Sequence, residues 1–340
     1  MEHCGRGDLR REIVWSPDDI GKHEWRLFAA NLEPQRLGKL VRWLRAIVPA
    51  ALADRLRSDT YRYMVGRIAR ADVIKTPKYA NTKQLGSVKV KYGAYEKAIS
   101  EFALSVFKSA EFTHEPQVVR YLIGAVDQKC LFVDVGAHFG YFSCLAAVRG
   151  ATVIAVELQR TLCLNIEANA LMNDQWRVHV LCAAIGAVPG VTQVERMDPS
   201  PGKQATEKGL RPNTYPLSSV NHEIVPVVTL DSIIDPRATA EFDRIIVKVD
   251  IEGAEIIALR GAARTIAERQ AVFVVEIHQQ HVATFDGTVE EVLDHFPDAG
   301  WTMTLMTDDG EKVVTREEFL SAAGGYLDTE NICVRFEPRR

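Results

Sequence analysis

The sequence predicts an α/β fold, in which a doubly wound, mostly parallel sheet carries helices on both faces. From residue 131 onward, apolar segments of strand length alternate with segments in which apolar residues recur every three or four positions, as in helices. Several strand segments are apolar throughout, which is typical of buried parallel strands. No clear helical pattern separates the last two strand segments, so we expect the final pair to be antiparallel.

The expected strands are Leu131–Val135, Thr152–Glu157, Val178–Ile185, Arg244–Asp250, Ala271–His278, Trp301–Thr307 and Asn331–Phe336. The expected helices among them are Tyr141–Arg149, Leu162–Met172, Ala254–Glu268 and Val289–Phe296. The alternation is interrupted at about 186–224, where prolines stand at positions 189, 199, 201, 212 and 216. A long insertion of this kind in an α/β domain predicts a lid or a substrate loop.

Residues 1–110 are predicted to form a mainly helical, basic region that precedes a domain at 111–340. Apolar residues three and four apart predict helices over Leu40–Leu56 and Tyr95–Phe107. Residues 1–130 carry 23 Lys and Arg against 15 Asp and Glu, whereas the rest of the chain carries 18 against 30. The first helix either packs on the domain that follows or lies on a membrane or glycolipid surface as a basic amphipathic helix.

The segment Lys75–Val90 is polar and predicts a loop or a short hairpin.

Composition excludes several classes of protein. Hydrophobic residues make up 47% of the chain and charged residues 25%, as in ordinary globular proteins. No apolar run approaches the roughly 20 residues that span a bilayer, and the first residues lack the apolar stretch of a secretory signal. Six cysteines without a CxxC pair are typical of reduced core thiols, so we expect a cytoplasmic protein. The net charge of −4 and the absence of a dense Lys/Arg cluster disfavour nucleic acid as a partner.

A glycine-rich turn follows the first strand of the domain and predicts a nucleotide-type cofactor site. Asp134 lies near the strand end, and Gly136 and Gly140 lead into a helix whose first N–H groups are free. Glu157 ends the next strand, where a carboxylate binds ribose hydroxyls. The spacing does not fit the G-x-G-x-x-G pattern of NAD sites, whereas the positive sulfonium of S-adenosylmethionine suits an acidic turn. The alternative is that Asp134 merely caps a turn without a ligand.

Two pairs of polar residues end neighbouring strands and form the expected chemical site. Lys248 and Asp250 share one strand face, as do Glu276 and His278. An imidazole with an unperturbed pKa near 6.5 is suited to accept the proton of an acceptor hydroxyl, so we expect His278 to be the general base.

Several alternatives for this site remain open. Lys248 and Asp250 could form a purely structural ion pair, and His278 could be a hydrogen-bonded histidine at the sheet edge. Glu252 and Glu255 could serve only the N-terminal dipole of the following helix. No metal ligand is assigned, although Asp250, Glu276 and His278 could hold a divalent ion, which loss of activity in EDTA and rescue by Mg²⁺ would reveal.

Seven segments stand in the order found in a known family: Val133–Gly140, Val156–Glu157, Asn169 with Asn173, Val228–Asp231, Lys248–Glu255, Leu259–Ala262 and Val275–His278. Over about residues 115–310 they resemble the FkbM-type S-adenosylmethionine-dependent methyltransferases. His138 and Leu158 stand where the family usually has Asn and Pro. The resemblance implies a class I (Rossmann-like) methyltransferase fold, S-adenosylmethionine as cofactor and O-methylation, often of sugars, glycans or secondary metabolites.

The sequence thus predicts a transferase that methylates a hydroxyl of a small molecule or glycan, with peripheral membrane contact as an open possibility. No D/N-P-P-Y/F block follows the fourth strand, which favours oxygen over nitrogen as the acceptor. The alternative is a non-catalytic scaffold on a degenerate methyltransferase fold. The expected cofactor-binding residues are Asp134, Gly136, Ala137, His138, Gly140, Glu157, Leu158, Ala184 and Asp250. The expected catalytic residues are Lys248, Asp250, Glu276 and His278.

Overall fold

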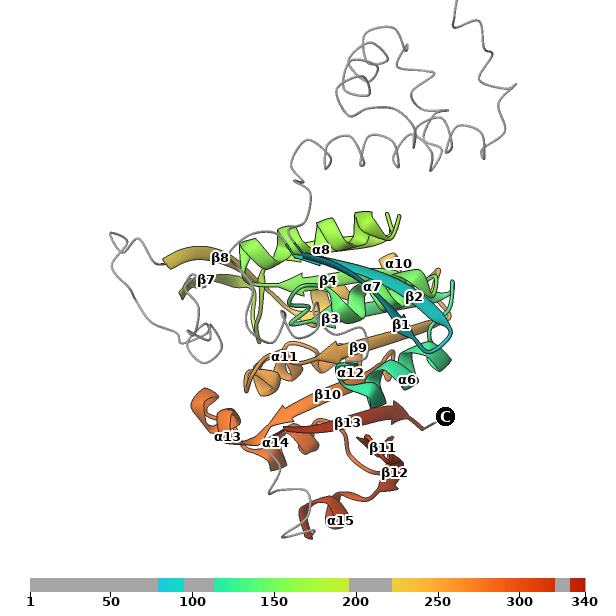
Figure 1. The fold of residues 1–340 in the computed structure, drawn as a ribbon. Coiled ribbons are helices and arrows are strands. Elements are labelled where there is room, and N and C mark those ends of the chain that lie inside the picture. The colour runs from blue at the N-terminus through green and yellow to red at the C-terminus, as the bar shows by residue number, and fades with distance from the viewer. Residues whose placement is uncertain (1–78, 95–112, 196–221, 322–330, 340) are drawn as a thin grey trace, which may run out of the picture. The chain divides into compact units, whose positions relative to one another are not determined.

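An eight-stranded sheet forms the centre of the compact unit that spans Thr76–Arg340 (Figure 1). The computed structural model describes residues 79–94, 113–195, 222–321 and 331–339. The strand order is β12-β11-β13-β10-β9-β3-β4-β5. In chain order these strands are β3 (Cys130–Val135), β4 (Thr152–Glu157), β5 (Val178–Cys182), β9 (Arg244–Val249), β10 (Val272–His278), β11 (Trp301–Thr307), β12 (Gly310–Val314) and β13 (Asn331–Pro338).

The strand directions confirm the predicted sheet. Strands β5, β4, β3, β9 and β10 run parallel to one another, and taken in chain order they follow the doubly wound arrangement 3-2-1-4-5. Strand β13 lies between β10 and β11 and is antiparallel to both, as expected for the last strand. Strand β12 and the helix after it, α15 (Arg316–Ser321), were not predicted from the sequence. Both are short and mostly exposed, so they lack an apolar pattern.

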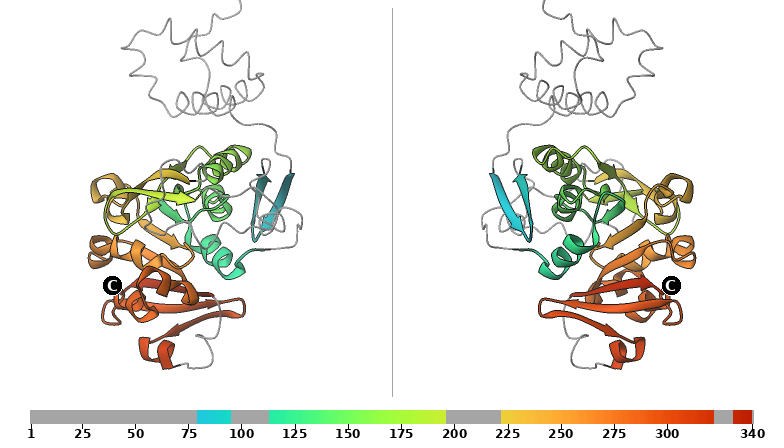
Figure 2. Two further views of the ribbon diagram at one scale, coloured as in Figure 1. Left: turned by 90° about the vertical axis from the view of Figure 1, so that its left-hand side faces the viewer. Right: turned by 90° about the vertical axis from the view of Figure 1, so that its right-hand side faces the viewer.

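Helices cover both faces of the sheet because side chains alternate along each strand. Phe132, Ile246 and Val274 point to the face covered by α6 (Pro116–Ala125), α7 (Tyr141–Val148) and α8 (Arg160–Met172). Leu131 and Val133, together with the residues in register with them on β9 and β10, point to the opposite face. That face is covered by α9 (Leu230–Ile233), α11 (Glu255–Arg260), α12 (Ala263–Ala267) and α14 (Val289–Asp294), as the two side views show (Figure 2). None of the helices in the described part of the chain has the length and apolar character needed to cross a bilayer.

A β-hairpin of β1 (Tyr79–Leu85) and β2 (Val88–Ala94) packs on α7 and α8, on the side away from the sheet (Figure 2). The sequence left open whether this polar stretch is a loop or a hairpin, and the structure shows a hairpin that extends to Ala94. Tyr92 is fully buried, stacks on Tyr141 with ring centroids 5.2 Å apart, and donates a hydrogen bond to the Tyr141 carbonyl. The hairpin therefore contributes to the same hydrophobic core as α6, α7 and α8.

Two asparagines tie this hairpin to α8. Asn169 Oδ1 accepts the N–H of Gly93, and Asn173 Oδ1 accepts the N–H of Lys91, both at 2.7 Å. The Asn169 amide also donates to the carbonyl of Phe139, in the turn that follows β3. Because Asn169 is fully buried, these bonds connect the hairpin to the glycine-rich turn through one side chain.

The predicted insertion at about 186–224 contains one strand and the start of a second. β7 (Gly190–Glu195) and β8 (His222–Val228) pair antiparallel and form a separate three-stranded sheet with β6 (Ala184–Ile185). The predicted strand Val178–Ile185 is thus divided between two sheets. Residues 196–221 within the insertion, and the predicted helices Leu40–Leu56 and Tyr95–Phe107, lie outside the described residues.

The predicted helix Ala254–Glu268 is instead two helices, α11 and α12. Gly261 lies so close to the carbonyl of Gly186 that a Cβ atom there would be 2.2 Å from the oxygen. The carboxylate of Asp231 accepts hydrogen bonds from the N–H groups of Arg264 and Thr265 and so caps a new helix. This tertiary contact explains the break, which the local sequence does not show.

Candidate functional site

The turn after β3 has the backbone conformation that its glycines predict. Gly136 and Gly140 have φ of 81° and 84°, in the left-handed region that glycine adopts most readily. A Cβ atom on Gly136 would lie 1.9 Å from the carbonyl oxygen of Asp250. The turn therefore passes directly against the segment that follows β9, and only glycine fits at this crossing.

Glu157, at the end of β4, is held by backbone donors from two loops. Its two oxygens accept the N–H of His138 at 2.9 Å and the N–H of Gln159 at 2.8 Å. The side chain is buried, and burial raises its pKa to about 7 despite these hydrogen bonds. His138 has a positive φ of 52°, which places its N–H in position for this bond.

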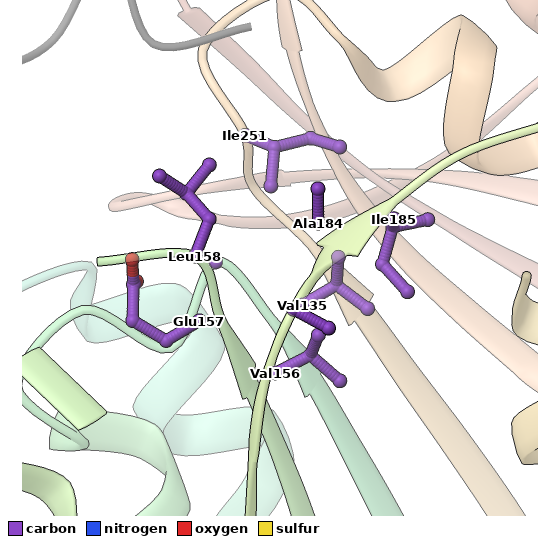
Figure 3. Close-up of a pocket in the computed structure, with 9 residues that line it drawn as sticks. Val135, Val156, Glu157, Leu158, Ala184, Ile185 and Ile251 are labelled. Atoms are coloured by element: carbon purple, nitrogen blue, oxygen red, sulfur yellow. The ribbon is translucent and has the colours of Figure 1, made fainter. Parts of the chain in front are cut away.

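A pocket opens between the ends of β3, β4 and β6 (Figure 3). Glu157 is the one ionisable residue among those that line it. Figure 3 shows the apolar side chains of Leu158, Ile185 and Ile251 around the opening, with the Glu157 carboxyl group at one side. The remaining lining residues are Val135, Gly136, Val156, Ala183 and Ala184. An apolar slot with a carboxylate at its edge suits an aromatic base joined to a sugar with two hydroxyls.

Asp134 does not line this pocket. Its carboxylate is 1% exposed and accepts a 2.5 Å hydrogen bond from the Ser143 hydroxyl of α7. Burial raises the pKa of Asp134 to about 6, although the charge of Lys248 and the Ser143 hydrogen bond act in the opposite direction. Asp134 therefore contributes to the buried structure next to the site and is not one of the residues that line the pocket.

Lys248 and Asp250 form a close ion pair at the end of β9. The Lys248 ammonium lies 2.7 Å from Asp250 Oδ2, 3.9 Å from Glu115 Oε2 and 4.7 Å from the centre of the Phe142 ring. Burial would lower the pKa of Lys248, but these carboxylates raise it well above its usual value. Burial would likewise raise the pKa of Asp250, but Lys248 and His278 hold it below its usual value. Both groups are therefore ionised at neutral pH.

His278 ends β10 and is surrounded by carboxylates. Its Nδ1 lies 2.9 Å from Glu255 Oε1, and its Nε2 lies 3.8 Å from Asp250 Oδ1 and 3.6 Å from Glu252 Oε2. Burial would lower the pKa of His278, but the hydrogen bond and charge of Glu255 and the charge of Asp250 raise it to about 9. The expectation for His278 rested on the unperturbed pKa near 6.5, and these neighbouring carboxylates are the reason for the difference. The role of His278 as a base remains a prediction.

Glu276 completes the group. One ligand atom from each of Asp250, Glu276 and His278 lies within 4.8 Å of the other two. We call these three residues the carboxylate–imidazole cluster. Burial, together with the charges of Asp250 and Glu115, raises the pKa of Glu276 to about 8. The four predicted catalytic residues therefore lie together at the carboxyl edge of the sheet.

The turn after β9 joins the pocket to the carboxylate–imidazole cluster. Asp250 belongs to the cluster, whereas the next residue, Ile251, lines the pocket. Glu252 adopts a positive φ of 56°, and Gly253 has φ of 104° with its Cα packed against His281. Glu255 Oε1 also accepts the N–H of Gly253, so the side chain that holds His278 holds this turn as well. A ligand in the pocket would therefore lie beside the cluster.

Apart from Asp134, the predicted cofactor residues divide into two groups. Gly136, Glu157, Leu158 and Ala184 line the pocket, and Asp250 lies against Gly136. Ala137, His138 and Gly140 shape the turn: Ala137 donates its N–H to the Val156 carbonyl, and Gly140 caps α7 and packs on Ile166.

Sequence reasoning missed the pocket residues Ala183, Ile185 and Ile251, and also Glu115. Ile251 directly follows Asp250 in the segment Lys248–Glu255, and this position next to an expected site residue could have revealed it. Glu115 precedes a helix that was not predicted, so no local signal marked it.

Glu157 predicts a pH dependence of stability in the ligand-free protein. Its pKa is about 7 when folded and 4.5 when unperturbed, so between these values the folded chain holds the additional proton. The free energy of unfolding should therefore fall as the pH rises from 5 to 7.5, and Glu157 should contribute about 2 kcal/mol of that fall. Urea unfolding of wild type and Glu157→Gln at both pH values measures this. Equal changes in the two proteins would contradict it.

Residues 134–302 match the family model described as "Methyltransferase FkbM domain". No curated protein matches the chain. Among solved structures, the chain is similar to the methyltransferase FkbM from Methylobacillus flagellatus KT, with 16% identity, a TM-score of 0.37, and coverage of 82% of this chain and 53% of that chain. The chain therefore spans about half the length of that structure.

Two further solved structures are similar. SMU.1697c from Streptococcus mutans, solved in complex with SAH, has 10% identity, a TM-score of 0.38, and coverage of 67% of this chain and 100% of that chain. The SAM-dependent methyltransferase from Agrobacterium tumefaciens has 12% identity, a TM-score of 0.38, and coverage of 78% and 72%.

The strand order, the glycine turn after β3 and the acidic end of β4 define a class I methyltransferase fold. Within that class, the chain carries a domain of the FkbM methyltransferase family, which is the family predicted from its sequence.

Proposed function

We propose that the protein transfers the methyl group of S-adenosylmethionine to a hydroxyl group, on a sugar, glycan or secondary metabolite. The observation that supports this most is the adjacency of two sites: the turn Asp250–Glu255 contributes Ile251 to the pocket and Asp250 to the carboxylate–imidazole cluster. The pocket would take the adenosine, with its ribose hydroxyls on Glu157. The acceptor would then lie at the cluster, in line with the methyl group.

Charge supports the same assignment. The carboxylates of Asp250, Glu252, Glu255 and Glu115 gather near Lys248 and His278. This excess of carboxylates favours the positive sulfonium and amino groups of the cofactor. After transfer, the sulfur is neutral, which weakens this attraction.

The reaction needs one proton acceptor. The acceptor oxygen forms its bond to the methyl carbon with its own electron pair, and the sulfur keeps the electron pair of the broken S–C bond. The hydroxyl proton passes to Glu252, whose carboxylate lies 3.6 Å from His278 Nε2, is 44% exposed and can release the proton to water. Lys248 takes no proton in this scheme, because its role is to hold Asp250 Oδ2 at 2.7 Å.

Calorimetric titration with S-adenosylmethionine and its demethylated product, SAH, tests the cofactor before an acceptor is known. We expect Glu157→Ala to weaken binding by about 10- to 100-fold, because hydrogen bonds to a buried carboxylate contribute about 1.5–3 kcal/mol. Glu268→Ala, at an exposed position on the C-terminal side of α12, serves as the control and should bind like wild type. If the folded wild-type protein binds neither compound, the proposal fails and the non-catalytic scaffold becomes the better interpretation.

A further inference from the structure

The ligand atoms of the carboxylate–imidazole cluster lie close together, although no hydrogen bond joins the three residues to one another. His278 Nε2 lies 3.8 Å from Asp250 Oδ1, which exceeds hydrogen-bond length, and all three ligand atoms lie within 4.8 Å of one another. A cation about 2.1 Å from each of two ligand atoms holds them about 3.0 Å apart at a right angle and about 4.2 Å apart when opposite. The three atoms therefore need only small side-chain movements to bind one ion.

His278 is oriented toward the centre of this cluster. Its side chain is 4% exposed, and its Nδ1 lies 2.9 Å from Glu255 Oε1, a carboxylate that is itself fully buried. Glu255 Oε1 also accepts the N–H of Gly253, which fixes the carboxylate in turn. Among the residues that the structure describes, none lies within hydrogen-bond distance of Nε2, which faces Asp250 and Glu252. A carboxylate behind an imidazole whose other nitrogen faces acidic groups is the arrangement that orients metal-binding histidines.

Lys248 does not compete for the ligand atoms. It contacts Oδ2 of Asp250 at 2.7 Å and Oε2 of Glu115 at 3.9 Å, so Oδ1 of Asp250 remains available. Glu276 forms no hydrogen bond and no ion pair within the described residues. Two carboxylates and one imidazole are a donor set suited to Mn²⁺, Fe²⁺ or Zn²⁺, because imidazole favours transition metals over Mg²⁺.

We propose that Asp250, Glu276 and His278 bind one divalent transition-metal ion, with Glu255 as the positioning residue of His278. The ion takes the place of a proton on Nε2. Three protein ligands leave coordination positions open, and in a catalytic site these positions accept substrate oxygens.

The role of the ion rests on the proposed function. At the acceptor end of the site, the ion would bind the hydroxyl that is methylated and a second oxygen beside it, so the acceptor class is a vicinal diol or another pair of neighbouring oxygens. The ion would lower the pKa of that hydroxyl, and Glu252 would take its proton. The methyl group then moves to the oxygen as described above, and the ion is neither oxidised nor reduced.

The test is a titration of the full chain with Mn²⁺, after dialysis against EDTA, in the absence of cofactor and acceptor. Electron paramagnetic resonance measures free Mn²⁺, and electron spin echo envelope modulation detects a directly bound imidazole nitrogen. We expect one bound Mn²⁺ per chain and a ¹⁴N signal. Glu276→Gln and His278→Gln should each weaken binding at least tenfold, and His278→Gln should remove the ¹⁴N signal. Glu255→Gln should weaken binding about 10- to 100-fold.

Glu276→Gln should fold, because Glu276 is partly exposed and forms no hydrogen bond with any residue in the described part of the chain. Glu290→Gln, which removes an exposed carboxylate from α14, is the matched control and should bind Mn²⁺ like wild type. Near-ultraviolet circular dichroism confirms that each variant is folded.

Absence of stoichiometric Mn²⁺ binding would overturn the inference, and so would binding that Glu276→Gln and His278→Gln leave unchanged. SAH titration in metal-free buffer keeps this outcome separate from the proposed function. Binding of SAH without Mn²⁺ refutes the metal site alone, whereas binding of Mn²⁺ without SAH refutes methyl transfer and leaves the site standing.

Discussion

Gly136→Ala is expected to destabilise the protein by about 2–5 kcal/mol and to abolish cofactor binding. Alanine at φ of 81° is strained by about 1–2 kcal/mol, and its Cβ atom would lie 1.9 Å from the Asp250 carbonyl oxygen and 2.9 Å from Ile251 Cγ2. Because these are backbone and pocket atoms, relief of the clash requires the two loops to separate. The separation would displace Ile251 from the pocket and Asp250 from the carboxylate–imidazole cluster.

Chemical denaturation and SAH titration measure the two effects of Gly136→Ala. Gly124→Ala is the control, because Gly124 lies in α6 and a Cβ atom added to it would have no neighbouring atom within 4 Å. Alanine there should be neutral or stabilising, by up to about 1 kcal/mol, since helix propensity favours it. A Gly136→Ala protein that keeps wild-type stability and SAH affinity would show that the two loops do not cross as described.

His278→Ala is expected to reduce kcat by about 10²- to 10⁴-fold while SAH affinity stays within about threefold of wild type. The side chain lies in the carboxylate–imidazole cluster and outside the residues that line the pocket, so its loss should affect the acceptor end of the site alone. His179→Ala, at an exposed position of the edge strand β5, is the control and should keep full turnover. The measurement needs an acceptor, which a screen of compounds with neighbouring hydroxyls can supply.

An outcome in which His278→Ala weakens SAH binding as much as it slows turnover would remove His278 from the acceptor site. Unchanged turnover would remove it from the reaction altogether.

The central sheet could be predicted because its strands are buried on both faces. Thr152–Glu157 and Trp301–Thr307 have the bounds expected from their apolar runs. Short exposed elements such as β12 carry no such signal: of its residues only Val314 is buried. The break between α11 and α12 depends on Asp231 and Gly186, which are distant in sequence, so local periodicity could not reveal it.

The proximity of the four expected catalytic residues could be predicted from the sequence, whereas the electrostatics of the candidate site could not. The end of β9 and the end of β10 meet at one sheet edge, so the alternation of side chains sufficed to bring Asp250 and His278 together. The pKa of His278, by contrast, depends on how close Glu255 comes, which only the packing of α11 on β10 determines. Glu115 directly precedes α6 and lies near Lys248. Its backbone has a left-handed conformation, which no pattern in the sequence predicts.

The hairpin of β1 and β2 also bears on where the folding unit of this protein begins. A chain shortened to start at residue 111, the boundary expected from the sequence, would lose Tyr92 from the core and the backbone groups that Asn169 and Asn173 bind. Asn169 also holds Phe139, so the loss would reach the glycine-rich turn. Any shortened chain intended for crystallisation or ligand screening should therefore start before Tyr79, because the hairpin contributes side chains to the hydrophobic core of the methyltransferase domain.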